Sequence, residues 1–169
     1  MAMLAYGYLK GSKVGQIKGS VIQKGKEDSI AVIAVSHSIA SPRDPQSGLP
    51  TGQRMHKPFV ITKELDKSTP ILYQVLCTNE NLTEVTVKYW TPQLKAATGT
   101  GQEVQHFTVK LTNANIASID FRMANIRHPD LVKFTEYEEI AMTYQKIEWT
   151  WTDGGITSGD DWNADRSTG

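Results

Sequence analysis

Apolar and polar residues alternate over many short stretches of this chain. Successive side chains point to opposite faces of a strand, so the pattern predicts β-strands with one buried face. It is clear in Val85, Val87 and Tyr89, with Thr86 and Lys88 between them. The same alternation occurs at Leu4–Tyr8, from Phe59 onward, and at Glu103–Thr112, Ile119–Met123 and Tyr137–Trp151.

Two stretches depart from simple alternation. Ser29–His37 is apolar on both faces, which predicts a strand buried on both sides or one that faces another subunit. In Tyr137–Trp151 the apolar positions change from even numbers, such as Met142, to odd numbers, such as Ile147. A regular strand keeps its phase, so we expect a β-bulge there or a strand that turns the corner of a closing barrel.

One segment, KSTPILYQVLCTNENL, has the spacing of a helix instead. Leu72, Val75 and Leu76 form an apolar stripe, and Pro70 suits the first helical turn. Cys77 is the only cysteine of the chain and falls in this pattern, so we expect it to be a reduced packing residue. These elements together predict a mainly β fold, an antiparallel β-barrel-like or sandwich domain with one α-helix.

The length of 169 residues fits a single domain over residues 1–169. Residues 152–169 are rich in Gly, Asp, Ser and Thr, so we expect a loop or a frayed tail there. The chain carries 18 basic and 18 acidic side chains, and this zero net charge argues against a nucleic-acid binder. Low net charge also weakens the repulsion between copies, which suits self-assembly.

Targeting signals are not visible in the sequence. The first residues, MAMLAYGYLKGSK, lack a charged region followed by a long apolar core, so we predict no secretory signal and synthesis in the cytoplasm. No apolar run approaches the roughly 18 residues of a membrane-spanning helix, so no membrane insertion is expected.

Catalytic and metal-binding patterns are also missing from the sequence. The four histidines lie on different predicted elements without the close spacings of a zinc site. No serine lies in a Gly-x-Ser-x-Gly elbow. Glu136, Glu138 and Glu139 are expected to form a solvated strand edge, and Trp149 and Trp151 are expected to pack in the core. The sequence therefore predicts no catalytic residue, no metal and no cofactor.

Between two predicted strands lies SPRDPQSGLPTGQRMHKP, residues Ser41–Pro58, here called the arm. Its eighteen residues include four prolines and two glycines. Loops longer than about 12–15 residues are uncommon in compact domains unless they are functional or disordered. The prolines stiffen the chain, and apolar Leu49 together with mainly basic charges suits contact with another subunit. An ordinary surface loop fits this composition equally well, so the residues alone leave both readings open.

A family resemblance bears on that choice. The block VSHSI, followed by SPRDPQSGLPTGQRMHKPFVITKELDKSTPILYQVL, resembles the signature block of the Hcp (haemolysin-coregulated protein) family. The later blocks FTVKLTN, ASIDFRM, YQKIEWTW and TSGDDW are also similar to that family. The resemblance extends over nearly the whole chain, although the first forty residues and the stretch from Trp90 to Gly101 match less clearly.

The resemblance implies a β-barrel-like core with one helix, assembled into hexameric rings that stack into the inner tube of the bacterial type VI secretion system. The implied partners are other copies of the chain, a trimeric spike protein, a contracting sheath and effector proteins inside the ring. The subunit itself is expected to be exported through that system. On this basis we predict that the arm contacts other subunits, above all between stacked rings, through Arg43, Asp44, Pro45, Leu49, Arg54, Met55, His56 and Lys57.

Two other functions stay open at this point. A phage tail-tube protein has a related architecture, and the sequence does not separate it from a secretion tube subunit. A small-ligand-binding β-barrel or an enzyme is supported only by the fold class and by some aromatic residues.

Overall fold

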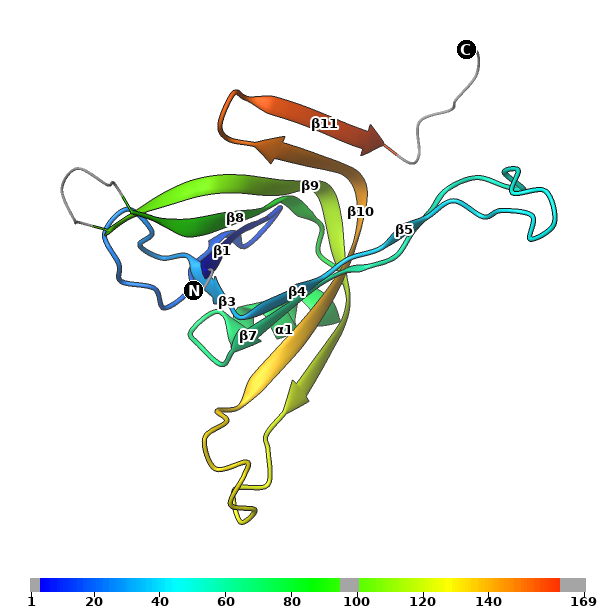
Figure 1. Ribbon diagram of the computed structural model, residues 1–169. Helices are drawn as coiled ribbons and strands as arrows, with labels where there is room; N and C mark the ends of the chain where they lie inside the picture. The colour runs from blue at the N-terminus through cyan, green and yellow to red at the C-terminus, as the bar shows by residue number, and fades with distance from the viewer. Residues whose placement is uncertain (1–3, 95–100, 162–169) are drawn as a thin grey trace.

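The computed structural model describes residues 4–94 and 101–161, which fold into strands, one helix and connecting loops (Figure 1). In chain order the elements are β1 (Leu4–Gly11), β2 (Gly15–Ile17), β3 (Ile30–Val32), β4 (Ala34–Ser36), β5 (Ile39–Ala40), β6 (Met55–His56), β7 (Phe59–Glu64), α1 (Thr69–Cys77), β8 (Leu82–Leu94), β9 (Gly101–Arg122), β10 (Tyr137–Trp151) and β11 (Ile156–Asp161). The prediction of a mainly β, antiparallel domain with one helix is confirmed for these residues.

The main sheet closes on itself through a single short segment. Its strands follow the order β2-β1-β8-β9-β10-β7-β4, and β3 pairs with β1 at the other end of that series. Because β3 and β4 are separated only by Ile33, one continuous stretch of chain joins the β1 edge to the β7 edge. We call this stretch, residues 30–36, the seam. The strand predicted at Ser29–His37 is therefore two short strands with different neighbours, and together they complete the barrel.

The predicted change of face in β10 is confirmed, and the same change occurs in the neighbouring strand β9. Buried positions in β10 fall on even-numbered residues as far as Tyr144, and the next buried position is the odd-numbered Ile147. In β9 the same change falls between Leu111 and Ala114, around Asn113, whose φ of 51° is left-handed. The Asn113 side-chain amide donates a hydrogen bond to Gln145 Oε1 at 2.9 Å. Both strands therefore turn the corner of the barrel at the same level.

The barrel interior is filled by aliphatic side chains from nearly every main strand. Leu9, Ile61, Val85, Leu111 and Ile147 are fully buried in one continuous cluster. Helix α1 adds to that cluster and packs against β9. Within residues 4–94 and 101–161, no helix is long and apolar enough to cross a membrane.

Helix α1 forms where the sequence predicts it. Leu72 and Val75 are buried, and Pro70 lies in the first turn. Asn79, just after the helix, has a left-handed φ of 52°, a conformation that asparagine tolerates at helix ends. Cys77, however, is exposed, so the expectation that it packs in the core is wrong.

An ion pair buried in the barrel wall contradicts another expectation. Glu138 is fully buried rather than part of a solvated edge, and its Oε1 atom lies 2.5 Å from Nζ of Lys63, which is also fully buried. Lys63 additionally donates to the Glu64 carbonyl at 2.9 Å and to Thr69 Oγ1 at 3.0 Å, and it lies 3.0 Å from Asp66 Oδ1. The alternation places both charges on the inward face, and the cluster joins β7, β10 and the start of α1.

The end of the chain is more ordered than predicted. Residues 152–155 form a turn in which Gly154 and Gly155 take positive φ values of 80° and 64°. The chain then returns as β11, which pairs with β10 from Lys146 to Trp151. The expected loop over 152–169 is therefore wrong for Ile156–Asp161, because an exposed outer strand needs no apolar face. Trp151 is exposed rather than packed in the core, and residues 162–169 lie outside the described part of the chain.

Candidate functional site

The arm is a long hairpin, paired at intervals, that projects from the barrel. It continues β4 and β7 outward, and Figure 1 shows it pointing away from the other strands. β5 pairs with β6 at its base. Further out, Arg43 and Pro50 form an isolated antiparallel bridge, and the Thr51 amide donates to the Pro42 carbonyl at 3.0 Å. The eighteen residues are therefore a paired ribbon, neither a disordered linker nor a loop folded onto the barrel.

The tip of the arm is a turn organised by Asp44. Its carboxylate accepts hydrogen bonds from the Gln46 amide at 2.9 Å and the Ser47 hydroxyl at 2.8 Å. Its backbone amide donates to the Leu49 carbonyl at 2.9 Å, and its carbonyl accepts from the Gly48 amide at 2.8 Å. The bonds to Gln46 and Ser47 hold the pKa of Asp44 below its usual value. Because Gly48 has a φ of 70°, a residue without Cβ suits this turn.

Most of the predicted contact residues are exposed on the arm. Leu49 is 64% exposed and Met55 is 53% exposed, and Arg43, Pro45 and Lys57 are exposed as well. A large aliphatic side chain at the end of a projecting hairpin has no core to join within its own subunit. The arm therefore presents apolar and basic groups to whatever lies beyond the barrel.

Arg54 and His56 behave differently, because both bind the barrel of their own subunit. The Arg54 guanidinium forms a two-pronged pair with the Asp160 carboxylate, in which Nη2 donates to Oδ1 at 2.8 Å. The same Nη2 donates to the Asp161 carbonyl at 3.0 Å. These bonds fix the root of the arm to β11, so Arg54 and His56 hold the arm in place rather than extend its exposed surface.

A chain of hydrogen bonds continues from this carboxylate into the barrel. His56 Nε2 lies 2.7 Å from Asp160 Oδ2, His56 Nδ1 lies 2.8 Å from the Tyr144 hydroxyl, and that hydroxyl lies 2.6 Å from His37 Nε2. All three contacts are satisfied when His37 donates to Tyr144, Tyr144 donates to His56, and His56 donates to Asp160. Both histidines are neutral in that arrangement. We call Arg54, His56, Asp160, Tyr144 and His37 the anchor.

The electrostatics of the anchor follow from these contacts. The hydrogen bond from Arg54, with a further one from His56, lowers the pKa of Asp160. Burial, with the Asp160 charge nearby, raises the pKa of Tyr144 to about 12. Burial, with a smaller contribution from His56, lowers the pKa of His37. The carboxylate is thus charged and Tyr144 and His37 are neutral at neutral pH, as the donor chain requires.

The sequence did not predict the anchor. His37 and His56 lie on different predicted elements, yet both contact one tyrosine. Tyr144 lies on the buried face of β10 and Asp160 lies in the stretch expected to be loop, 104 positions from His56. Within the described residues, no group of three or more His, Cys, Asp or Glu side chains is arranged to hold a metal ion.

The fold and the arm together define a class: a small closed β-barrel that projects an anchored hairpin. Comparison with known proteins identifies the family. The profile described as "Type VI secretion system effector, Hcp" matches residues 8–151. The chain is 38% identical over 173 residues to the "Major exported protein" of Pseudomonas aeruginosa, covering 97% of this chain and 98% of that relative.

Solved structures agree with this assignment. A crystal structure of an Hcp protein has 35% sequence identity and a TM-score of 0.85, covering 97% of this chain and 100% of that one. Hcp1 of E. coli EAEC 042 has 35% identity and a TM-score of 0.81, covering 95% of this chain and 99% of that one. The chain belongs to the Hcp family. It is a type VI secretion tube protein, which is a structural role.

Proposed function

We propose that this chain forms hexameric rings that stack into the type VI inner tube, and that the arm makes the contact between stacked rings. In this proposal the rings carry effector proteins in their lumen and meet the spike protein at the tip and the sheath outside. The subunit is made in the cytoplasm, is exported with the tube, and acts without catalysis or cofactor.

The observation that carries the proposal is the exposed, stiff arm. From Ser41 to Pro45 the outgoing leg of the hairpin spans five residues before the chain turns back, which at about 3.3 Å per residue gives a reach of roughly 17 Å. The anchor fixes its direction, so little conformational entropy remains to be lost when the tip binds. A preorganised hairpin with an apolar tip is suited to contact a second subunit.

Symmetry gives the arm a second constraint. A head-to-tail contact that closes generates a ring, and one that does not close generates an open filament. A tube requires both kinds, one within each ring and one between rings. A projecting arm suits the contact between rings, because it reaches beyond the barrel along one direction.

The relatives support this assignment over the alternatives. The similar proteins are Hcp proteins, and one of them carries the name "Major exported protein". No observation in the described residues favours a phage tail tube or a ligand-binding barrel instead.

The test replaces Pro45–Gly52, the outer part of the arm, with a short Gly–Ser linker. Because these residues add nothing to the barrel core, the variant should fold and keep its rings. We expect shorter tubes by electron microscopy and less release into the medium. Leu49→Ser should have a milder effect in the same direction.

A matched control is Ile22→Ser, which removes an aliphatic side chain that is 92% exposed on a different loop. It should leave tube length unchanged. Parent-like tubes and release from the shortened arm would overturn the proposal, and so would equal effects of Ile22→Ser and Leu49→Ser.

A further inference from the structure

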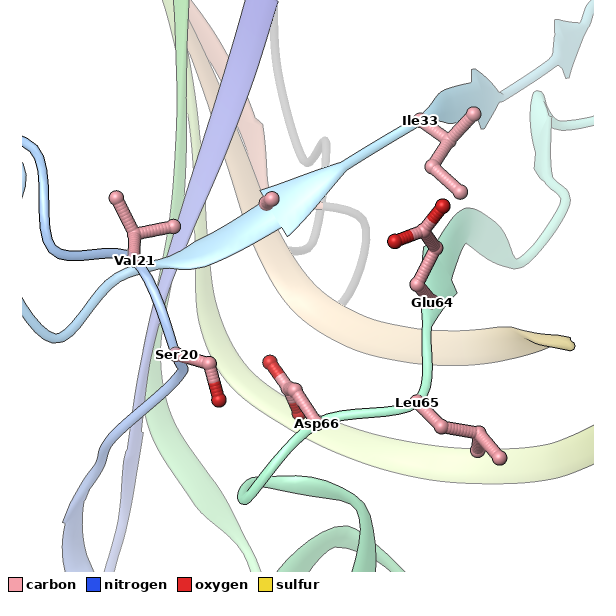
Figure 2. Close-up of a pocket in the computed structure, with 7 residues that line it drawn as sticks. Ser20, Val21, Ile33, Glu64, Leu65 and Asp66 are labelled. Atoms are coloured by element: carbon pink, nitrogen blue, oxygen red, sulfur yellow. The ribbon is translucent and has the colours of Figure 1, made fainter. Parts of the chain in front are cut away.

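A groove runs beside the seam of the barrel. It consists of two adjoining hollows of about 250 Å³ and 400 Å³ that share Ile33 and Glu64. Val21 and Leu65 line the first hollow, and Phe134 lines the second. Figure 2 shows the Glu64 side chain directed from the end of β7 toward Ile33. We call these five residues the seam groove.

The groove leaves a large apolar surface in contact with solvent. Ile33 is 58% exposed and Phe134 is 61% exposed. Near Phe134, the connection between β9 and β10 also exposes Met123, Ile126 and Val132. Ile33 and Phe134 line the same hollow, and exposed apolar surface gathered in this way marks interaction sites in soluble proteins.

The groove also carries an accessible negative charge. The Glu64 side chain is exposed and accepts one hydrogen bond, from the Thr135 hydroxyl at 2.7 Å. Asp66, in the first hollow, is already held by Lys63 at 3.0 Å and by the Ser68 amide at 2.9 Å. Glu64 is therefore the carboxylate in the groove that lies open to an incoming cation.

The tip of the arm has the complementary chemistry. Leu49 provides an exposed aliphatic group, and Arg43 lies across the hairpin from Pro50, the residue that follows Leu49. The Arg43 guanidinium donates only a long hydrogen bond, 3.4 Å, to the Gly48 carbonyl, and its charge faces no carboxylate in the described residues. Asp44 is used within the turn, so the tip presents a leucine and a free arginine.

We propose that the seam groove receives the arm tip of a second copy of this chain in the neighbouring ring, with Leu49 against Ile33 and Phe134 and Arg43 toward Glu64. This inference rests on the proposed stacking role of the arm and adds the surface that the arm binds. Burial of the leucine supplies affinity, and the charge pair sets the register between the rings.

The arm cannot fill the groove of its own subunit. In Figure 1 the arm extends to one side, whereas β3 and the end of β7, which border the groove, lie on the other side of the barrel. Pairing along the hairpin and the anchor keep it extended. Tip and groove are different surfaces, so their contact is head-to-tail, and it propagates as a filament when its rotation does not close a ring.

Cross-linking between two separately tagged proteins tests this contact. Both carry Cys77→Ser, because the native cysteine is exposed. One carries Leu49→Cys and the other Ile33→Cys, and they are mixed under conditions that form tubes and then oxidised. We expect a disulfide-linked dimer that contains both tags.

The control replaces Ile33→Cys by Val104→Cys. Val104 is 37% exposed and lines a different groove, beside Trp151 at the far end of β10 from Tyr137. A second pair, Gln46→Cys with Lys133→Cys, keeps both apolar partners intact in case Leu49→Cys or Ile33→Cys prevents assembly. Lys133 lines the second hollow, and both replaced residues are exposed.

The outcomes separate this inference from the proposed function. A cross-link to the seam groove but not to Val104 supports it. A cross-link to Val104, or no groove cross-link with either pair while tubes form, overturns it. If shortening the arm abolishes stacking yet the cross-link forms elsewhere, only the inference fails. If the shortened arm stacks normally, the proposed function fails first.

Discussion

Lys63→Met removes one charge of the buried ion pair while keeping a side chain of similar length. Lys63 and Glu138 are both fully buried, and their charged atoms are 2.5 Å apart. Removing one partner leaves the other charge uncompensated in a medium of low polarity, which typically costs about 3–5 kcal/mol. At roughly 2–4 °C per kcal/mol for a chain of this size, the thermal midpoint should fall by about 6–20 °C.

The measurements are thermal unfolding, for the midpoint, and urea unfolding, for the free energy, both followed by tryptophan fluorescence. Protomer concentration must be held constant, because association stabilises the folded state. The double variant Lys63→Met with Glu138→Leu should recover a large part of the loss, since neither charge is then left alone. Lys67→Met is the matched control: Lys67 pairs with Asp28 at 3.2 Å, but its side chain is 54% exposed. Its loss should stay within about 0.5 kcal/mol.

The reasoning fails if Lys63→Met unfolds at the same urea concentration as Lys67→Met. It also fails if the double variant loses as much free energy of unfolding as Lys63→Met and Glu138→Leu lose separately, added together. Either result would mean that the two buried charges do not depend on each other.

Three further predictions follow from the fold and the anchor. Leu72→Ala should cost about 2–5 kcal/mol in a urea titration through lost burial and a cavity, whereas exposed Gln74→Ala should change little. Asn113→Val should cost about 1–2 kcal/mol, because a β-branched residue fits poorly at a φ of 51°, and Asn113→Gly should largely avoid that cost. Burial lowers the pKa of His37 below its ordinary 6.5, so the unfolded chain binds the proton more readily than the folded chain. The contribution of His37 to the free energy of unfolding is therefore complete above pH 6.5 and declines as the pH falls below that value. The unfolding midpoint of His37→Gln should therefore change less between pH 7 and 5 than that of the parent.

The sequence predicts the elements well because their signals are local. The period of two marks the strands, and the proline and apolar stripe of α1 mark the helix. Closure of the barrel has no such signal, because β3 and β4 look like one strand until their partners are known. β11 was not predicted from the sequence, because it is exposed along most of its length and so lacks an apolar face.

The buried ion pair could have been predicted in part from the sequence. Lys63 continues the inward series of Phe59 and Ile61, and Glu138 begins the inward series of Ile140 and Met142. Two opposite charges, each on the apolar face of its strand, indicate a buried pair if those strands are neighbours. Their pairing is what periodicity alone does not supply.

The arm was visible from its composition, but its anchor was not. Length, prolines and Leu49 fitted both an ordinary surface loop and an arm that contacts another subunit, and the family resemblance favoured the arm. Arg54 and His56 looked like the exposed residues around them, and only the position of Asp160 on β11 shows that they turn back to the barrel. Contacts between residues more than a hundred positions apart leave no local pattern to read.

The continuity of the arm with β4 and β7 has a mechanical consequence. A pull on the tip acts on both legs of the hairpin in the same direction, so it does not peel β4 from β7. The force passes instead into the anchor and into the ladder between β7 and β10, which runs from Phe59 opposite Met142 to Glu64 opposite Tyr137. That ladder lies along the line of pull, so its hydrogen bonds are sheared together and none is opened first. A subunit built this way should resist tension through its arm as one piece, which suits the stacked tube proposed above.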